Sequence, residues 1–448
     1  MRKVKKHIGL IIILMIVIAF PTSLSNQIKI NLRVIVTGIA VDKSGDEFEV
    51  TAQIMKPSAG SKTSGSNAEI DYVSDKGKTL AGAISKLSFK TGKASAFSHT
   101  NFVILGNDML QEDVSVCLDY FIRDKIIKNS ALVLFAEEKA SDEIKKTKNT
   151  DLSVAMGLQK VFLFKEHESD GIMTTMMQFL NSNRGKSETA VVSVLSLKSN
   201  EETSGSGSSG GGSSSGGSSG GEGSSGSSSE GSSSSGGESQ GSGGESQGSE
   251  SSSGGSSGSS GGSGGSGESG KQYFVADAPI LIFTRGRYVG KLEGEDEVSG
   301  YMLTHKNAKA IDLMVESSDD GRLKDAKLEI NIKNMGASRS VRFENDKPVI
   351  DVKIKIYNAE INEILCEDIV ALLTEEEYKT MKKDLSEEIK GRVEKCFKKA
   401  KESNADIFEA YEKAYRKHYK KTQKYKSMEE FLKDLTLNVE VEVRKLDH

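Results

Sequence analysis

Few residues in this chain have types and spacings that could support catalysis or metal binding. Six of its 448 residues are histidines, at His7, His99, His167, His305, His418 and His448. No two of them form an H-x-x-H or H-E-x-x-H motif, the spacing that places two imidazoles on one helix face beside a metal ion. The histidines therefore do not indicate a metal-dependent hydrolase, and we expect no metal or cofactor site.

A serine and a histidine are neighbours at Ser98 and His99. Adjacent residues on a strand point to opposite faces, so this hydroxyl and imidazole would not form a nucleophile–base pair. The G-x-S-x-G turn of hydrolases is also missing from the sequence. We interpret His99 as structural and expect no catalytic residue.

The tripeptide Gly77-Lys78-Thr79 resembles the end of a phosphate-binding loop. The upstream glycine of that motif is missing, and residues 71–74 do not read as a strand that opens into a glycine-rich loop. We expect no nucleotide site. Asp42 and Asp46 lack the glycine and distal glutamate of a calcium loop, which favours a solvated turn.

Two further clusters have plain structural interpretations. Asp119 and Asp124 flank Arg123, a pattern typical of a solvated helix face where the arginine pairs with a neighbouring carboxylate.

The second cluster combines aromatic and basic side chains, namely Tyr411, Tyr415, Arg416, Tyr419 and Lys420. It could form a contact surface, but core packing is the safer interpretation for Tyr411 and Tyr415.

Charge and cysteine content exclude other classes of protein. The net charge is -4, but residues 203–270 hold six Glu and no Lys or Arg, which leaves the remainder near +2. No global basic field for nucleic acid is present. Cys117, Cys366 and Cys396 form no close pair, so neither a disulfide framework nor a zinc site is indicated. We expect Cys117 and Cys396 to be core residues.

The first 25 residues indicate export. Four basic residues precede the apolar run Ile8–Phe20, which as a helix would rise only ~20 Å, short of the ~30 Å hydrocarbon core. A secretory signal cleaved after Ser23-x-Ser25 and an uncleaved anchor are the two interpretations. Both place everything after about Asn26 on the far side of a membrane.

Residues 203–270 are almost wholly Ser and Gly and should form a flexible coil with an r.m.s. span of ~45 Å. The tract either links two domains or is a long insertion in one surface loop, since loop closure costs little more as loops lengthen.

Alternating and helical apolar patterns predict an α+β fold with antiparallel sheets. Before the tract we expect a hairpin, a helix, a strand, a helix and a strand, followed by helices. Their ranges are 34–41 with 47–55, 79–87, 101–105, 114–127, 131–135, 152–164 and 171–180. After the tract we expect a hairpin, two alternating strands, a long helix capped by Thr374 and Glu377, a second helix with Tyr411 and Tyr415, and a closing strand. Their ranges are 278–283 with 288–292, 328–332, 350–356, 374–397, 407–415 and 437–443.

The order of several short motifs is similar to that in the Ger(x)C proteins, the C subunits of bacterial spore germinant receptors. The motif residues are Val36–Asp42, Val50–Gln53, Gly77–Leu80, Ala83, Ser98-His99, Gly106, Asp119–Asp124, Phe283, Val289–Leu292, Gly300-Tyr301, Asn404–Phe408 and Glu430-Phe431. The resemblance covers most of the chain outside residues 203–270.

This resemblance implies a non-enzymatic subunit of three mixed α/β domains on the outer face of the inner spore membrane, beside two integral membrane partners of A and B type. It implies no cofactor, no nucleic acid and no direct nutrient binding. The family-motif residues that it carries over are Gly77, Thr79, Ser98, His99, Arg123, Asp124, Asp406 and Phe408.

The chain departs from the family pattern in several places. The family's lipid-bearing cysteine is expected around Thr22–Asn26, yet no cysteine precedes Cys117. The chain has no tryptophan, and the family's position for one near the last helix holds Ser427 or Met428. Glu409-Ala410-Tyr411 replaces a glycine-rich stretch. The missing cysteine favours retention of residues 1–25 as an anchor.

We therefore predict four segments: a signal or anchor at 1–25, a Ger(x)C-like region at 26–202, a disordered linker at 203–270 and a second Ger(x)C-like region at 271–448. The last is strand-rich over 271–372 and helix-rich over 373–448, ending in a strand. The predicted function is an extracytoplasmic, membrane-associated germinant-receptor subunit for nutrient-triggered germination. The alternative is a secreted or surface-anchored protein that binds a small ligand or the cell wall.

Overall fold

The fold is known from a computed structural model that describes residues 32–56, 69–123, 126–148, 157–199, 273–305, 308–319, 321–366 and 373–447. The apolar run Ile8–Phe20, the tract at 203–270 and Asp124 lie outside these residues, as does the start of the helix expected at 152–164. Within them the mixed α+β class is confirmed.

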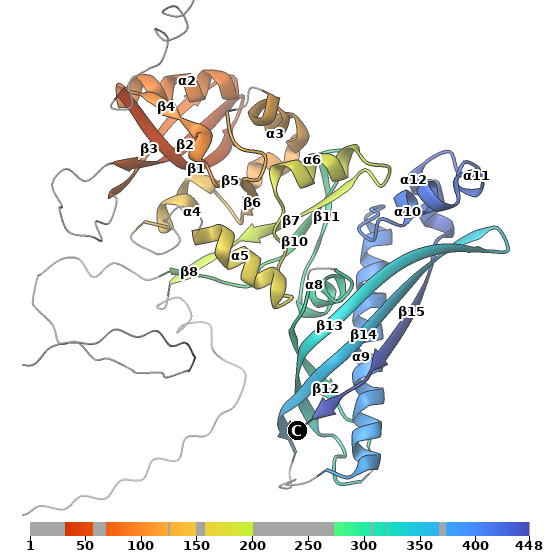
Figure 1. The fold of residues 1–448 in the computed structure, drawn as a ribbon. Helices are drawn as coiled ribbons and strands as arrows, with labels where there is room; N and C mark the ends of the chain where they lie inside the picture. The colour runs from red at the N-terminus through yellow and green to blue at the C-terminus, as the bar shows by residue number, and fades with distance from the viewer. Residues whose placement is uncertain are drawn as a thin grey trace, which may run out of the picture. The chain divides into compact units, whose positions relative to one another are not determined.

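A nine-stranded sheet carries the first half of the fold, in the order β11-β10-β7-β6-β5-β1-β2-β3, with β4 paired to β1 (Figure 1). Its strands are β1 Arg33–Ser44, β2 Glu47–Lys56, β3 Glu69–Gly77, β4 Ala94–Ala96, β5 Phe102–Leu105, β6 Leu132–Ala136, β7 Thr189–Leu195, β10 Ile280–Thr284 and β11 Arg287–Leu292.

Helices cover both faces of this sheet. One hydrophobic core contains residues of α2 (Leu80–Thr91), α3 (Val114–Arg123) and α6 (Met176–Arg184). A separate core on the other face contains residues of α4 (Ala140–Lys146) and α5 (Gly157–His167). Consecutive residues of β6 therefore pack into different cores, with Val133 in the first and Leu134 in the second.

The centre of the sheet is parallel, so the expectation of antiparallel sheets throughout is wrong. The pairs β1–β5, β5–β6 and β6–β7 all run parallel. The reason is that α3 connects β5 to β6 as a β-α-β crossover, and strands covered on both faces become continuous apolar runs. The strands β7 and β3 were not predicted. Residues 71–74, which did not read as a strand in the sequence, lie within β3.

Most of the predicted local elements before the tract are confirmed, although the helix expected at 171–180 is α6, which begins at Met176, and the one expected at 114–127 is α3, which ends at Arg123. β1 and β2 form the expected hairpin, with Gly45 at φ +60° in the turn. The side chain of Thr79 caps α2 by accepting a hydrogen bond from Gly82 N at 3.0 Å, and Leu80, Ala83, Ile84 and Leu87 are buried as predicted.

The segments that flank the Ser/Gly tract are hydrogen-bonded neighbours. β8 (Leu197–Ser199) pairs antiparallel with β9 (Tyr273–Val275), with Lys198 opposite Phe274. A few residues later β10 pairs with β7 of the first sheet. The chain thus leaves and re-enters the fold at one place, which favours a loop insertion over a linker between two separate bodies.

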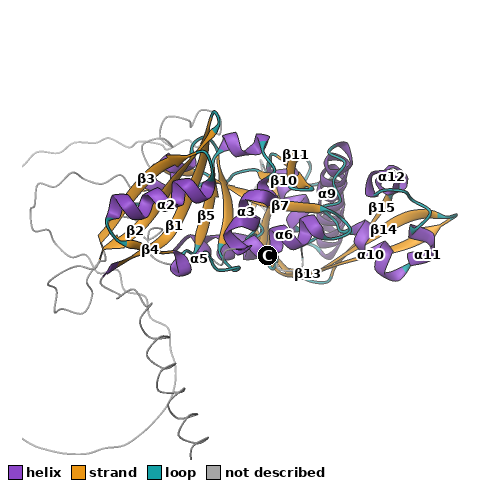
Figure 2. Ribbon diagram, turned by 90° about the horizontal axis from the view of Figure 1, so that it is seen from above, coloured by secondary structure: helices purple, strands orange, loops and turns teal. Residues whose placement is uncertain are grey.

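A five-stranded sheet carries the second half, in the order β12-β13-β14-β15, with β16 paired to β14. The strands are β12 Ile311–Glu316, β13 Lys327–Glu344, β14 Lys347–Leu365, β15 Thr436–Val443 and β16 Leu446–Asp447. The closing strand β15 runs parallel to β14, again contrary to the antiparallel expectation. In Figure 2, α10, α11 and α12 lie beside β14 and β15.

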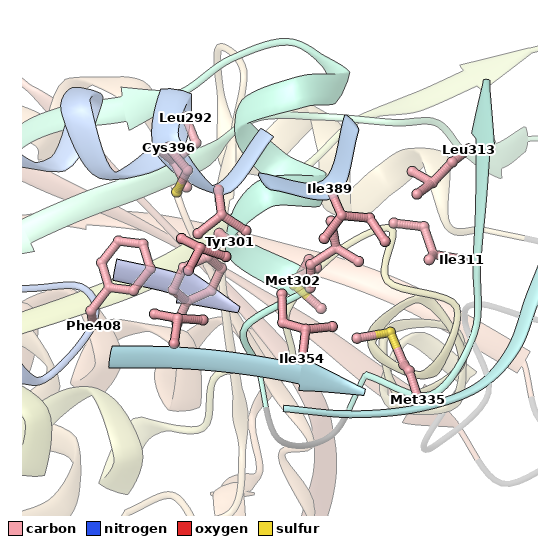
Figure 3. Packing of buried hydrophobic residues seen from close by; sticks show 14 of the residues in the cluster. Leu292, Tyr301, Met302, Ile311, Leu313, Met335, Ile354, Ile389, Cys396 and Phe408 are labelled. Atoms are coloured by element: carbon pink, nitrogen blue, oxygen red, sulfur yellow. The ribbon is translucent and has the colours of Figure 1, made fainter. Parts of the chain in front are cut away.

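The long helix α9 (Glu375–Glu402) packs against this sheet together with α8 (Glu295–Met302). The capping box is confirmed, because Thr374 N donates to Glu377 Oε2 at 2.6 Å and Glu377 N donates to Thr374 Oγ at 3.3 Å. Figure 3 shows Ile389 and Cys396 of α9 in the same core as Tyr301, Met302 and Ile354.

The remaining helices are α10 (Ala410–Lys417), α11 (Tyr419–Thr422) and α12 (Met428–Asp434). The cap of α12 is Ser427, whose side chain accepts a hydrogen bond from Glu430 N at 3.2 Å. Cys117 and Cys396 are buried as predicted, and burial raises the pKa of the Cys117 thiol to about 12.

Candidate functional site

Asp406 lies in the turn between α9 and α10, and its residue surface is only 2% exposed. Its carboxylate accepts three hydrogen bonds. Ser187 Oγ donates to Oδ2 at 2.6 Å, Tyr411 N donates to Oδ2 at 2.8 Å, and Ala410 N donates to Oδ1 at 2.7 Å. The two backbone donors belong to the first turn of α10, so Asp406 caps that helix from outside it.

Backbone amides of the same turn and of α10 donate hydrogen bonds to side-chain hydroxyls at the start of β7. Asp406 N donates to Thr189 Oγ at 3.1 Å, and Thr189 is the first residue of β7. Glu412 N donates to Ser187 Oγ at 3.3 Å. Ser187 and Thr189 therefore join β7 to the α9–α10 turn, and we call these two residues and Asp406 the junction.

Burial raises the pKa of the Asp406 carboxyl above its ordinary value, and the hydrogen bonds from Ser187, Ala410 and Tyr411 act in the opposite direction. Each of these donors is neutral, so the charge is stabilised by dipoles and not by a counter-ion. A carboxylate saturated by internal donors is suited to fixing one conformation and poorly suited to proton transfer.

Phe408 is two residues away and is also 2% exposed or less, but it packs elsewhere. Its ring meets Phe397 of α9 edge-to-face with centroids 5.7 Å apart, inside the core of the second sheet. Figure 3 shows Phe408 at one end of this core. Asp406 thus ties the α9–α10 turn to the start of β7, and Phe408 anchors the same turn to α9.

A second buried carboxylate, Asp42, lies at the carboxyl end of β1 and corrects the expectation of a solvated turn. Asp42 is 4% exposed and accepts hydrogen bonds from Ala140 N at 2.7 Å and Ser141 N at 2.8 Å, at the start of α4. Gly106 fits against it, because a Cβ there would lie 2.2 Å from Asp42 Oδ1. Only Asp46 of the predicted pair is exposed.

The position of Asp42 matters chemically. Open α/β sheets bind anionic ligands at the carboxyl ends of parallel strands, beside helix N-termini. In this fold the chain's own carboxylate fills that position.

Comparisons with known proteins assign the family. The model of the spore germination protein N-terminal domain matches residues 26–197, and the model of the spore germination B3/GerAC-like C-terminal domain matches residues 280–446. The chain belongs to the Ger(x)C family of spore germination proteins. The two matches lie on either side of the Ser/Gly tract and together cover most of the chain.

Individual relatives align over shorter stretches. Spore germination protein B3 of Bacillus subtilis (strain 168) is 27% identical over 107 residues, which are 23% of this chain and 28% of that protein. YfkR of the same organism, whose name also associates it with spore germination, is 28% identical over 156 residues, or 34% of this chain and 40% of YfkR. The chain thus spans less than half the length of either curated relative.

A crystal structure of the GerBC protein aligns with 91% of this chain and 96% of that chain, at 15% identity and a TM-score of 0.46.

The other family-motif residues of this Ger(x)C protein lie apart from the junction. Gly77 ends β3 and Thr79 caps α2, and a Cβ on Gly77 would lie 2.6 Å from Ala83 N. Close packing accounts for the glycine and helix capping for the threonine.

Ser98 and His99 are not on a strand, as the sequence suggested, but in the 3₁₀ turn η2 (Phe97–His99). Both side chains are exposed. Ser98 borders an open surface cavity of about 490 Å³ with Ile126, Ile127 and Lys128.

Arg123 ends α3 and lies 3.9 Å from Asp119, which also pairs with Arg184 at 2.5 Å. This confirms the predicted surface pairing, whereas Asp124 is outside the described residues. The motif residues therefore do not form one site.

Among the described residues no group of His, Cys, Asp or Glu is arranged to hold a metal ion. None of the described helices is long and apolar enough to cross a membrane. Sequence reasoning missed Ser187 and Thr189, because nothing in their local pattern indicates a partner more than 200 residues away.

Proposed function

We propose that this chain is a non-enzymatic, extracytoplasmic subunit of a spore germinant receptor, required for nutrient-triggered germination. It is held at the outer face of the inner spore membrane and acts by contact with two integral membrane subunits of A and B type. It binds no nucleic acid and does not bind the nutrient itself.

One observation carries the proposal. The two family models match in chain order on both sides of the tract, and strands β7 and β10 from the two matched regions pair within one sheet. A chain whose two homologous regions are joined in this way fits a single rigid contact module better than two independent binding domains.

The state of the buried acids supports a non-enzymatic role. Asp406 and Asp42 are two of the buried carboxylates, and both oxygens of each accept hydrogen bonds from donors of the chain itself. We propose that Asp406 and Phe408 keep the two regions in one arrangement, and that the exposed motif residues Ser98, His99 and Arg123 face a partner. Residues 26–202 and 271–448 are the two proposed regions.

Residues 1–25 are the proposed membrane attachment, since the family's lipid-bearing cysteine is missing before Cys117. Mass spectrometry of the mature N-terminus tests this part. A first residue of Met1 or Arg2 is expected, and a first residue near Asn26 would show that the segment is cleaved.

Co-purification tests the receptor role. A tagged chain isolated from the inner membrane of spores should bring down two polytopic membrane proteins, and deletion of its gene should impair nutrient-triggered germination. Recovery of the chain free in the culture medium, without a membrane partner, would favour the alternative of a secreted ligand-binding or wall-binding protein.

A matched pair of variants sharpens this test. Asp406→Ala should reduce both partner recovery and germination, because it removes the acceptor of the junction. Asp142→Ala changes an exposed carboxylate on α4 that, among the described residues, pairs with Lys145 alone, so it should leave both unchanged.

A further inference from the structure

Residues 413–426, which we call the basic head, are a stretch of strong net positive charge in the described chain. It contains seven Lys or Arg residues and no Asp or Glu. The stretch runs from the second half of α10 through α11 to the turn before α12. Such a density of cations is not needed to build two short helices.

The basic head is held at the tip of the β13–β14 hairpin, as Figure 1 shows for α10 and α11. His418 Nε2 lies 2.9 Å from Val341 O, and its ring meets Phe343 edge-to-face with centroids 5.6 Å apart. Lys421 Nζ lies 5.4 Å from the centre of the Phe343 ring. These contacts fix the head on a rigid support.

Four of the seven cations have acidic partners. Lys413 pairs with Glu409 at 3.0 Å, and Arg416 pairs with Glu412. Lys421 and Lys424 share a single carboxylate, Asp346, at 3.3 and 2.9 Å. Because one aspartate serves two lysines, the paired residues themselves keep an excess positive charge.

The other three cations are Lys417, Lys420 and Lys426. All three are exposed, and they make no ion pair with any residue that the structure describes. Beside them Tyr419 is 47% exposed, and its ring stands edge-on to Tyr415 with centroids 5.0 Å apart. Lys186 adds another cation, 4.5 Å from the centre of the Tyr415 ring.

Unpaired lysines around an exposed tyrosine match the chemistry of an anionic bilayer surface. Clusters of four to eight Lys or Arg bind acidic phospholipid, each contributing roughly fivefold to the affinity, and tyrosine is enriched at the headgroup level. Nucleic acid is disfavoured as the partner, since the chain outside the tract is close to neutral and the export signal places it across a membrane.

We propose that the basic head, through Lys417, Lys420, Lys426 and Tyr419, docks on the headgroups of a bilayer that contains anionic phospholipid. This contact gives the chain a second, electrostatic attachment besides residues 1–25. The inference rests on the proposed placement beside a membrane, but not on the identity of the receptor partners.

The test uses the full chain with an environment-sensitive fluorophore on Gln423→Cys, an exposed position beside Lys424. Cys366→Ser removes the half-buried thiol, while Cys117 and Cys396 are buried. The chain is inserted into vesicles of phosphatidylcholine alone or with about one third phosphatidylglycerol. A reporter at position 423 detects docking of the head even if residues 1–25 already hold the chain on the vesicle.

The fluorophore should shift to shorter wavelength with phosphatidylglycerol only, and about 1 M salt should abolish the shift because the Debye length falls to ~3 Å. Lys417→Gln, Lys420→Gln and Lys426→Gln together should lower the docked population by on the order of 100-fold. The matched control is Lys379→Gln, Lys390→Gln and Lys398→Gln, which removes three exposed cations of α9 and should change nothing.

Equal shifts with both lipids, or equal losses in the two triple variants, would overturn the proposal. So would an equally strong response to double-stranded RNA in solution, which would indicate general polyanion binding. Co-purification with the receptor partners is independent of all these outcomes, so the receptor role and the lipid contact can fail separately.

Discussion

The two sheets of this protein bury their apolar side chains in different ways. In the first sheet β5, β6 and β7 are buried at every position, because helices cover both faces. In the second sheet β12 alternates strictly between buried and exposed residues, because α8 and α9 cover one face only. The outer face carries ion pairs such as Lys353–Glu440 at 2.7 Å.

The difference changes the pattern by which a strand can be recognised in the sequence. A strand covered on one face has a period of two, which few other structures share. A strand covered on both faces is a short apolar run that cannot be distinguished from a buried helix segment by periodicity alone. The alternating strands β13, β14 and β15 were predicted but β12 was not, and of the strands buried at every position β5 and β6 were predicted but β7 was missed.

The largest expected effect tests this contrast directly with neighbouring residues. Leu134→Ala and Phe135→Ala in β6 should lower the free energy of unfolding by about 3 and 4 kcal/mol, because each leaves a cavity in its own core. In β14, Ile354→Ala should cost about 3 kcal/mol, but Lys355→Ala less than about 0.5 kcal/mol, since Lys355 is exposed and pairs with Glu442 at 3.5 Å. Urea denaturation followed by circular dichroism measures all four.

A cost above about 2 kcal/mol for Lys355→Ala, or none for one of the β6 variants, would contradict the distinction between a sheet covered on two faces and one covered on a single face.

The junction between the two regions should produce the next largest effect. Asp406→Ala should destabilise the protein by about 3 kcal/mol, because it leaves Ser187 Oγ and the amides of Ala410 and Tyr411 without their acceptor. Asp142→Ala, at an exposed acid, should change stability by less than about 0.5 kcal/mol.

Asp406 should also show a signature in the pH dependence. Its folded pKa is raised by burial, so its contribution to stability is complete below the unfolded pKa near 3.8 and is lost as pH rises through the folded pKa. The stability of the wild type relative to Asp406→Asn should therefore fall as pH rises above the unfolded pKa near 3.8. A difference that rises with pH would show that hydrogen bonds outweigh burial at this carboxyl.

Close helix packing belongs to the second region and gives a smaller effect. A Cβ on Gly300 would lie 2.2 Å from Arg392 O, so Gly300→Ala should force α8 from α9 and cost about 2 kcal/mol. Gly391→Ala, one residue earlier on α9 and with no atom within 4 Å of the new Cβ, should instead stabilise by about 1 kcal/mol. Thermal unfolding distinguishes these opposite signs, and equal signs would refute the close-contact argument.

The smallest effect concerns the Ser/Gly tract between β8 and β9. Deletion of residues 203–270 should leave the fold intact and raise stability by at most about 2 kcal/mol, because β8 and β9 are already paired and a shorter loop costs less entropy to close. Removal of only half the tract should give about 0.6 kcal/mol. A loss of stability in either deletion would show that the tract contributes contacts of its own. Thermal unfolding measures both.

Local signals were read correctly from the sequence in both regions. Thr374 was identified as the cap of α9, and the apolar faces predicted for α2 and α9 are their buried faces. The candidate residues were placed less well: Ser98 and His99 lie in a 3₁₀ turn, and Asp42 is a buried cap. Asp406 was selected only through the family resemblance.

The sequence by itself determined the caps, the turns and the alternating strands, because each depends on residues within one or two turns of the chain. Only the tertiary structure decided the parallel strand directions and the partners of the buried acids. Asp42 meets Ala140 across 98 residues, and Asp406 meets Ser187 across 219. Burial makes a hydrogen-bond partner obligatory for each carboxylate, but the fold as a whole selects which distant donor supplies it.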